Sequence, residues 1–260
     1  GAMTDYTYDS RSPWYSCRTY IKRVVMQQGV TSIGDHAFWD CSGLTSVTIP
    51  DGVTSIGGDA FSGCAALTSV TIPSSVTSIG GGAFSGCTSL TSVAIPSSVT
   101  EIGGSAFSGC TELTSITIPE GVTSIGGGAF SGCTGLTSVT IPDSVTSIGN
   151  SVFSGCTALT AVTIPESVTY INGEVFSNCV RLAKVTIPKS VTEISSKAFY
   201  YCDSLTDVYY AGTAADWAKI SISEGNEDLL AAALHYKPTP LTAPSVTGGN
   251  DSQGRPTLKW

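Results

Sequence analysis

The feature that most constrains this chain is a 23-residue interval that recurs through most of its 260 residues. Phenylalanine, cysteine and proline each follow it in a separate ladder. The phenylalanines stand at positions 38, 61, 84, 107, 130, 153, 176 and 199, the cysteines at 41, 64, 87, 110, 133, 156, 179 and 202, and the prolines at 50, 73, 96, 119, 142, 165 and 188. Three ladders on one interval predict a solenoid. Because one turn cannot bury its apolar side alone, neighbouring turns must stack to form the core.

The repeat over residues 110–131 reads CTELTSITIPEGVTSIGGGAFS and shows how each turn is expected to fold. Residues two apart on a strand point to the same side, so Ile116 and Ile118 face inward. Ser115 and Thr117 then face outward. Pro119 is expected to end the strand, because proline cannot donate to a strand ladder.

The second half of the repeat predicts another extended piece and a corner. Val122 and Ile125 begin this piece, and Gly126 is expected to supply a corner with positive φ. Ala129 and Phe130 are expected in a short helical or 3₁₀ turn, with the phenylalanine closing the core. The corner column reads Gly34, Gly57, Gly80, Gly103, Gly126, Gly149, Asn172 and Ser195. With strands about 4.8 Å apart, eight turns predict a rod or shallow arc of roughly 40 Å.

The pattern L-x-x-I-x-I-P followed by V-T-S-I-G-x-x-A-F-x-x-C resembles the BspA-like leucine-rich repeats of bacterial surface proteins. The resemblance implies a leucine-rich-repeat solenoid that is mainly β, with short strands, short helical or 3₁₀ turns, and about eight 23-residue repeats between capping segments. It also implies a cell-surface or secreted protein-interaction module that attaches to proteins or glycans on host or bacterial surfaces. Fibronectin and fibrinogen are the ligands usually named for this family.

The segments outside the repeats divide the rest of the chain. Trp14 and Trp217 are expected to cover the open ends of the stack, as terminal turns must. Residues 244–246 and 254–260 are similar to the first two strands of a fibronectin type III domain. The expected organisation is a tag remnant, Gly1-Ala2-Met3, with an N-terminal lead-in over residues 1–16, a repeat array over 17–210, a C-terminal cap over 211–236, and a linker with the truncated start of a further domain over 237–260.

The charge pattern disfavours two classes of partner. The formal net charge is −8, and the chain has no lysine or arginine between Arg23 and Arg181. Nucleic acid binding requires clustered cations, so neither nucleic acid nor an anionic membrane surface suits this stretch. No run of about 18 apolar residues is present, which argues against membrane insertion of this segment.

The cysteines are expected to be structural. Eight of the nine occupy one column, about 5 Å apart in the stack, where parallel inward side chains suit buried free thiols better than disulfides. The chain has no Cys-x₂-Cys pair, and its two histidines, His36 and His235, lie far apart in sequence, so no metal or cofactor is expected. A cation on the acidic column of Glu120, Asp143 and Glu166 is disfavoured, because one carboxylate per turn is too few for calcium.

The sequence also offers little catalytic machinery. A serine or cysteine nucleophile needs a histidine beside it. His36 is expected in an exposed turn and His235 on the surface of the cap, so the chain is not expected to be an enzyme. Paired carboxylates for glycoside hydrolysis stay open at this point, because any two acidic residues can meet in a fold.

The outward strand positions distinguish one end of the array from the rest. Most hold Ser and Thr, and they become charged and aromatic from about Ala161 onward. Tyrosine and arginine are types that anchor interfaces. We therefore expect a ligand-binding surface in the late turns, and the candidate residues are Tyr170, Arg181, Lys184, Asp207 and Tyr209.

Three alternatives to this adhesive surface stay open. The late turns can differ simply because terminal turns vary in sequence and contribute side chains to the cap. The whole array can act as a structural spacer, or stalk, that displays neighbouring domains. The outward Ser-x-Thr pairs also resemble the hydroxyl arrays that bind ice or carbohydrate, although serine lacks the methyl group of threonine and the strand face is expected to be concave.

Overall fold

The computed structural model describes residues 1–7, 9–236, 249–250 and 256–257. The linker and the fibronectin-type segment predicted over 237–260 therefore lie outside the described residues, apart from one short antiparallel pair. This pair joins β20 (Gly249–Asn250) to β21 (Pro256–Thr257).

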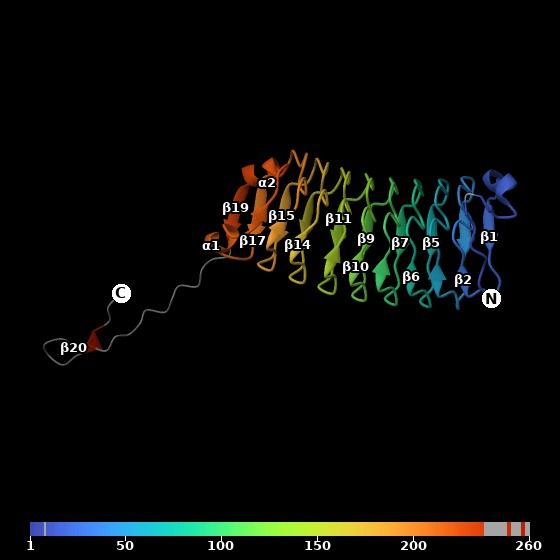
Figure 1. Cartoon of the computed structure of the whole chain (residues 1–260), viewed down its shortest axis with the longest axis horizontal. Coiled ribbons are helices and arrows are strands. Elements are labelled where there is room, and N and C mark those ends of the chain that lie inside the picture. Colours follow the sequence, from blue (N-terminus) through green and yellow to red (C-terminus); the bar gives the residue numbers. More distant parts are fainter. Residues whose placement is uncertain (8, 237–248, 251–255, 258–260) are drawn as a thin grey trace.

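Two short strands form in each turn, and the turns stack in register (Figure 1). Strands of successive turns pair in parallel at the 23-residue interval, as where Ser115 lies opposite Ser138. The first strands of the turns are β1 (Arg23–Val25), β3 (Ser46–Thr48), β5 (Ser69–Thr71), β7 (Ser92–Ala94), β9 (Ser115–Thr117), β11 (Ser138–Thr140), β13 (Ala161–Thr163), β15 (Lys184–Ile187) and β17 (Asp207–Tyr210). The second strands are β2 (Ser32–Ile33), β4 (Ser55–Ile56), β6 (Ser78–Ile79), β8 (Glu101–Ile102), β10 (Ser124–Ile125), β12 (Ser147–Ile148), β14 (Tyr170–Ile171) and β16 (Glu193–Ile194).

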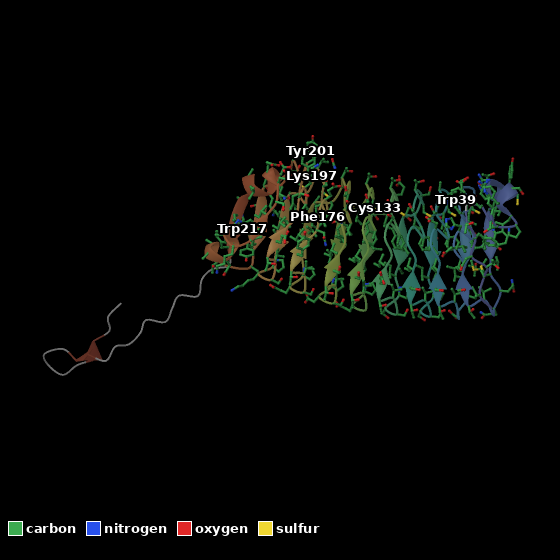
Figure 2. The ribbon with its side chains drawn as sticks, in the orientation of Figure 1. Trp39, Cys133, Phe176, Lys197, Tyr201 and Trp217 are labelled. Carbon is green, nitrogen blue, oxygen red and sulfur yellow. The ribbon has the colours of Figure 1, made fainter. Side chains whose placement is uncertain are left out.

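The apolar columns fill the interior of the coil, which confirms the predicted solenoid. On β9, Ile116 is buried while Ser115 and Thr117 are exposed, as the alternation predicts. The phenylalanine rings stack on one another, with centroids 5.3 Å apart between Phe61 and Phe84 and 5.7 Å apart between Phe153 and Phe176. Phe176 and Cys133 are both fully buried (Figure 2).

A third edge, which we call the turn edge, closes each coil with consecutive hydrogen-bonded turns. The N–H of Ala129 donates to the carbonyl of Gly126 at 3.2 Å, and that of Ser131 donates to Gly128 at 2.9 Å. Gly128 and Gly132 have φ of 66° and 71°. These left-handed residues separate the successive turns, so the predicted helical piece does not run on as a regular helix.

The corner column was interpreted wrongly, because Gly126 does not have a positive φ. Glycine fills this column from Gly34 to Gly149, where the backbones of adjacent turns meet closely. A Cβ on Gly126 would lie 2.4 Å from the backbone nitrogen of Gly104, and one on Gly80 would lie 2.7 Å from the carbonyl carbon of Gly57. The left-handed position falls two residues later, where Gly128 stands.

The N-terminal segment covers the first turn. Trp14 stacks on Phe38 with ring centroids 5.3 Å apart, so it extends the phenylalanine stack as a lid. The 3₁₀ helix η1 (Tyr15–Tyr20) follows it. Ala2 forms a parallel bridge with Ser32, so the residues assigned to a tag remnant lie along the edge of β2.

The C-terminal segment covers the last turn with two strands and two short helices. β18 (Ser221–Ile222) pairs with β16, and β19 (Ala233–Tyr236) pairs with β17. The helices are α1 (Ala214–Trp217) and α2 (Glu227–Ala231). The side chain of Asn226, just before α2, accepts from the N–H of Phe199 at 3.0 Å and donates to the carbonyl of Ser195 at 2.9 Å. It thus bonds backbone groups that another turn would otherwise cover.

The second tryptophan lid also lies where it was predicted. Trp217 packs edge-on against Tyr210, with ring centroids 5.2 Å apart, at the base of the cap (Figure 2). Across the residues that the structure describes, no helix combines the length and apolar character that crossing a membrane would require.

Candidate functional site

The most varied outward side chains lie on the sheet that continues the column of first strands into the C-terminal cap. Strands β13, β15, β17 and β19 form one parallel sheet, in which Lys184 lies opposite Asp207 and Tyr209 lies opposite His235. Val185 and Val208 alternate with these residues and point into the core. We call the outward group of Lys184, Asp207, Tyr209 and His235 the C-terminal patch.

The patch is held in place by its own contacts. His235 Nε2 lies 2.7 Å from Asp207 Oδ1, and the hydroxyl of Thr206 donates to Asp207 Oδ2 at 2.8 Å. The imidazole also stacks against Tyr209, with ring centroids 4.7 Å apart and an interplanar angle of 17°. The tyrosine remains 40% exposed. The patch therefore presents an ordered aromatic group beside charged groups, which reduces the entropy lost when a partner binds.

The same contacts change the acidity of Asp207. Its hydrogen bond with His235 is the largest cause, and its hydrogen bond from Thr206 the next, of a pKa held below the ordinary value of an aspartate. The charge of Lys184 acts in the same direction. Asp207 therefore carries its negative charge throughout the neutral range.

The structure brings together three of the five predicted site residues. Lys184, Asp207 and Tyr209 lie on adjacent strands of one sheet face. Arg181 is exposed in the turn that leads into β15. Tyr170 lies on β14, in the other sheet, where it is paired with Glu193 rather than with any patch residue.

His235 was assigned to the surface of the cap, and its place in the patch was missed. The signal was present, because Leu234-His235-Tyr236 repeats the apolar and polar alternation of β17. It was hidden because the cap departs from the 23-residue interval. Ala233, not a residue 23 positions on, pairs with Asp207.

A second group of late side chains lies apart from the patch. Tyr200 and Tyr201 have ring centroids 4.1 Å apart, and Lys197 Nζ lies 5.7 Å from the ring centre of Tyr200. Lys197 and Tyr201 lie on the turn edge (Figure 2). A partner that contacts the C-terminal patch therefore meets a different face of the molecule.

The cysteine column is buried and free, as predicted. Each column thiol from the second turn onward contacts a backbone carbonyl of the preceding turn, as where Cys133 Sγ donates to Phe107 at 3.2 Å. Burial raises the pKa of the Cys87, Cys133 and Cys179 thiols to about 12. Since the thiolate is the reactive form, these side chains serve packing rather than chemistry. Cys17 alone among the described cysteines is exposed.

Two further features bear on binding. Among the residues that the structure describes, no group of three His, Cys, Asp or Glu side chains is placed to hold a metal ion. A groove of about 270 Å³ lies between β11 and β13, at the edge of the sheet that carries the patch. It is lined by Val139, Thr140, Ile141, Ala161, Val162 and Thr163.

The stacked parallel turns and the buried side-chain columns define a leucine-rich-repeat solenoid. The model of the BspA type leucine rich repeat region matches residues 11–137 and 82–206, with six copies of the repeat, and the chain belongs to this family. Family membership indicates a protein-interaction module.

Two solved structures of bacterial proteins, with TM-scores above 0.5, agree with this assignment. A leucine-rich repeat protein from Bacteroides ovatus is 27% identical, with a TM-score of 0.63, over 91% of this chain and 70% of that one. The leucine-rich repeat protein of T. pallidum is 28% identical, with a TM-score of 0.57, over 78% and 87% of the two chains. A leucine rich cell surface protein from Faecalibacterium prausnitzii is 31% identical over 77% and 82%, with a TM-score of 0.38. No curated protein matches the chain.

Proposed function

We propose that this chain is an extracellular adhesion module, displayed on a bacterial surface or secreted, which binds a protein or glycan of a host or bacterial surface through its C-terminal patch. The observation that carries this proposal is the change in the outward strand face. Positions occupied by Ser115 and Thr117 on β9 are occupied by Lys184 and Thr186 on β15, and by Asp207 and Tyr209 on β17. The scaffold beneath these positions does not change.

The chemistry of the patch suits a protein partner. Tyr209 offers an exposed aromatic edge, and such rings supply much of the energy at interfaces because they bury a large area with few rotatable bonds. Lys184 and the ionised Asp207 flank it with opposite charges. Such charges select a partner more than they strengthen its binding. Arg181 is exposed in the turn that leads into β15 and adds a positive charge near the start of that strand.

The experiment measures binding of the whole chain to immobilised fibronectin, fibrinogen and a panel of bacterial surface extracts by biolayer interferometry. Lys184→Glu combined with Tyr209→Ala is expected to weaken binding to the ligand found by at least about tenfold, which corresponds to about 1.4 kcal/mol. Ser115→Glu combined with Thr117→Ala makes the matched change on β9 and is expected to leave affinity unchanged.

Tyr170→Ala distinguishes a ligand that binds the patch alone from one that also contacts the second sheet. Because Tyr170 lies in the other sheet, its removal is expected to have no effect on a ligand bound to the patch. Loss of binding in this variant, or equal losses in the β9 and patch variants, would overturn the patch as the binding surface.

A spacer is the second candidate function, and the uniform turns before Ala161 favour it. Their outward positions are Ser, Thr or Ala in nearly every turn, as in β5, β7 and β9. A stalk needs stacking and solubility and requires no particular surface. Absence of binding to every component of the panel, with the array folded, would favour this function over adhesion.

A further inference from the structure

The backbone hydrogen bonding of the array is interrupted at one junction between turns. The second strands form one continuous sheet from β2 to β12, and a separate sheet begins at β14. At the same junction the first strands β11 and β13 are also unpaired. At the other described junctions where first strands fail to pair, such as β7 to β9, the second strands β8 and β10 remain paired.

Asn172 accounts for the break in the second sheet. In the turns before it, the N–H of a corner glycine donates to the isoleucine carbonyl of the preceding turn, as where Gly149 donates to Ile125 at 2.8 Å. At Asn172 this backbone bond is replaced, because the side-chain Nδ2 donates to Ile148 at 2.6 Å. Ser195 keeps the backbone bond, to Ile171 at 2.9 Å. Ser195 thus keeps the ladder bond although it carries a Cβ, so we attribute the interruption at Asn172 to its competing amide.

Neighbouring bonds are lost with it. Thr146 donates its N–H to Thr123 at 3.0 Å, and Thr192 donates to Thr169 at 2.9 Å. The corresponding bond from Thr169 to Thr146 is not formed. On the first sheet, the groove between β11 and β13 opens at the same junction.

The turn edge remains closed across this junction. Phe153 donates its N–H to Val175 at 2.9 Å, and Gly155 donates to Ser177 at 2.7 Å. The Phe153 and Phe176 rings stay stacked 5.7 Å apart, the same separation as between Phe130 and Phe153 in the turn before. At the second-sheet edge the bonds that cross the junction involve side chains: Asn172 Nδ2 donates to Ile148, Ser167 Oγ donates to Val145, and the N–H of Gly173 donates to Asn150 Oδ1. The turn edge thus keeps its backbone bonds while the backbone ladders of the two sheet edges are interrupted, which is the arrangement of a hinge.

We propose that this junction is a joint, about which the N-terminal block (residues 1–156) and the C-terminal block (residues 159–236) rotate by opening and closing the two sheet edges. The C-terminal patch lies wholly in the second block. Its orientation relative to the uniform face is therefore set by the joint, and Asn172 is the residue that keeps the sheet from closing.

The first test is amide hydrogen exchange on the whole chain, resolved by NMR. The amide of Thr169 is expected to exchange at least about tenfold faster than those of Thr146 and Thr192, which hold the same position in adjacent turns. Asn172→Gly removes the competing amide and leaves the Ile148 carbonyl free to accept from the backbone N–H, so it is expected to slow exchange of Thr169 to the rate of its neighbours. Ser195→Gly changes the same column where the ladder is already intact, and is expected to leave all three rates unchanged.

The second test measures motion between the blocks. Spin labels at exposed Cys17 and at the Glu224→Cys position report the distance between the two ends of the array by pulsed electron resonance. The distance distribution is expected to be broader with Asn172 than in the Asn172→Gly variant. Equal distributions, or a Thr169 amide as well protected as that of Thr146, would overturn the joint.

Discussion

The N-terminal and C-terminal blocks share the same buried columns and differ in what they present outward. Phe107 and Phe199 are equally buried, one in each block. Outside, β9 shows serine and threonine, while β17 shows Asp207 and Tyr209. The difference teaches that stacking fixes the inward positions, whereas the outward positions are free to acquire a partner. Substitutions that follow this division should separate stability from binding.

The largest effect expected is alkaline destabilisation that begins in the N-terminal block. Burial raises the thiol pKa from 9.0 to about 12 at Cys87 and Cys133, so the unfolded chain releases protons before the folded one. The contribution of each buried thiol to the free energy of unfolding is complete below pH 9. It is lost as the pH rises toward the pKa of the thiol in the folded protein. Each thiol then lowers the unfolding free energy by about 1.4 kcal/mol per pH unit. Of the eight column thiols, the N-terminal block holds Cys41, Cys64, Cys87, Cys110, Cys133 and Cys156.

Urea unfolding between pH 7 and pH 10.5, under reducing conditions, measures this loss. Hydrogen exchange at the upper end of the range is expected to increase first in the N-terminal block. Cys110→Ala serves as the control and is expected to make the pH dependence shallower by the share of one thiol. Unfolding free energies that stay constant above pH 9 would contradict the prediction.

The next largest effect is expected from the phenylalanine stack. Phe107→Ala removes a fully buried ring between two stacked neighbours and is expected to lower the unfolding free energy by about 3–5 kcal/mol. Thr117→Ala, on the exposed side of β9, is expected to change it by less than about 0.5 kcal/mol. Chemical denaturation of both variants makes the comparison. Similar losses in the two variants would contradict a core confined to the inward columns.

The sequence was sufficient for the solenoid because its information is periodic. The same buried residue type recurs at the same position of successive turns, as in the columns of Ile116, Phe107 and Cys110. Each assignment can therefore be checked against the other turns. The backbone corner was different. A glycine column is explained equally by positive φ and by close approach, and only the spacing between adjacent turns distinguishes them. Gly126 required the second explanation.

The candidate site was predicted in part, for a related reason. Lys184, Asp207 and Tyr209 follow the interval, so their common face could be predicted from it. His235 lies in the cap, where the interval changes, and Tyr170 falls on the second strand of its turn. Neither the partner of a cap residue nor the angle between the two sheets is encoded in the repeat itself.

A smaller effect distinguishes the two glycine columns. Gly126→Ala places a Cβ against the backbone of Gly104 and is expected to cost about 1–3 kcal/mol. Gly128→Ala places a Cβ 3.3 Å from the Ser105 hydroxyl, a side-chain atom that can move, at φ of 66° in a column where Ser105 and Ser151 already stand, and is expected to cost about 1 kcal/mol. Thermal unfolding of the pair measures the difference. A larger loss in Gly128→Ala than in Gly126→Ala would contradict close approach of the backbones as the reason for glycine at Gly126.

The smallest effect concerns the patch, where a change in acidity is expected with little change in stability. His235→Gln removes the imidazole that is the main cause of the low pKa of Asp207, so that pKa should rise toward its ordinary value. A carboxylate with a depressed pKa adds stability above its unfolded pKa and loses it as the pH falls through the folded one. The loss therefore lies in the acid range, and it stays small because the pair is exposed to solvent. Carbon NMR of the Asp207 carboxyl between pH 2 and pH 6 measures the shift, with Thr206→Val as a control for the second hydrogen bond. An Asp207 pKa unchanged in His235→Gln would show that the imidazole does not order the patch, and the contrast between the two blocks would then rest on Lys184 and Tyr209 alone.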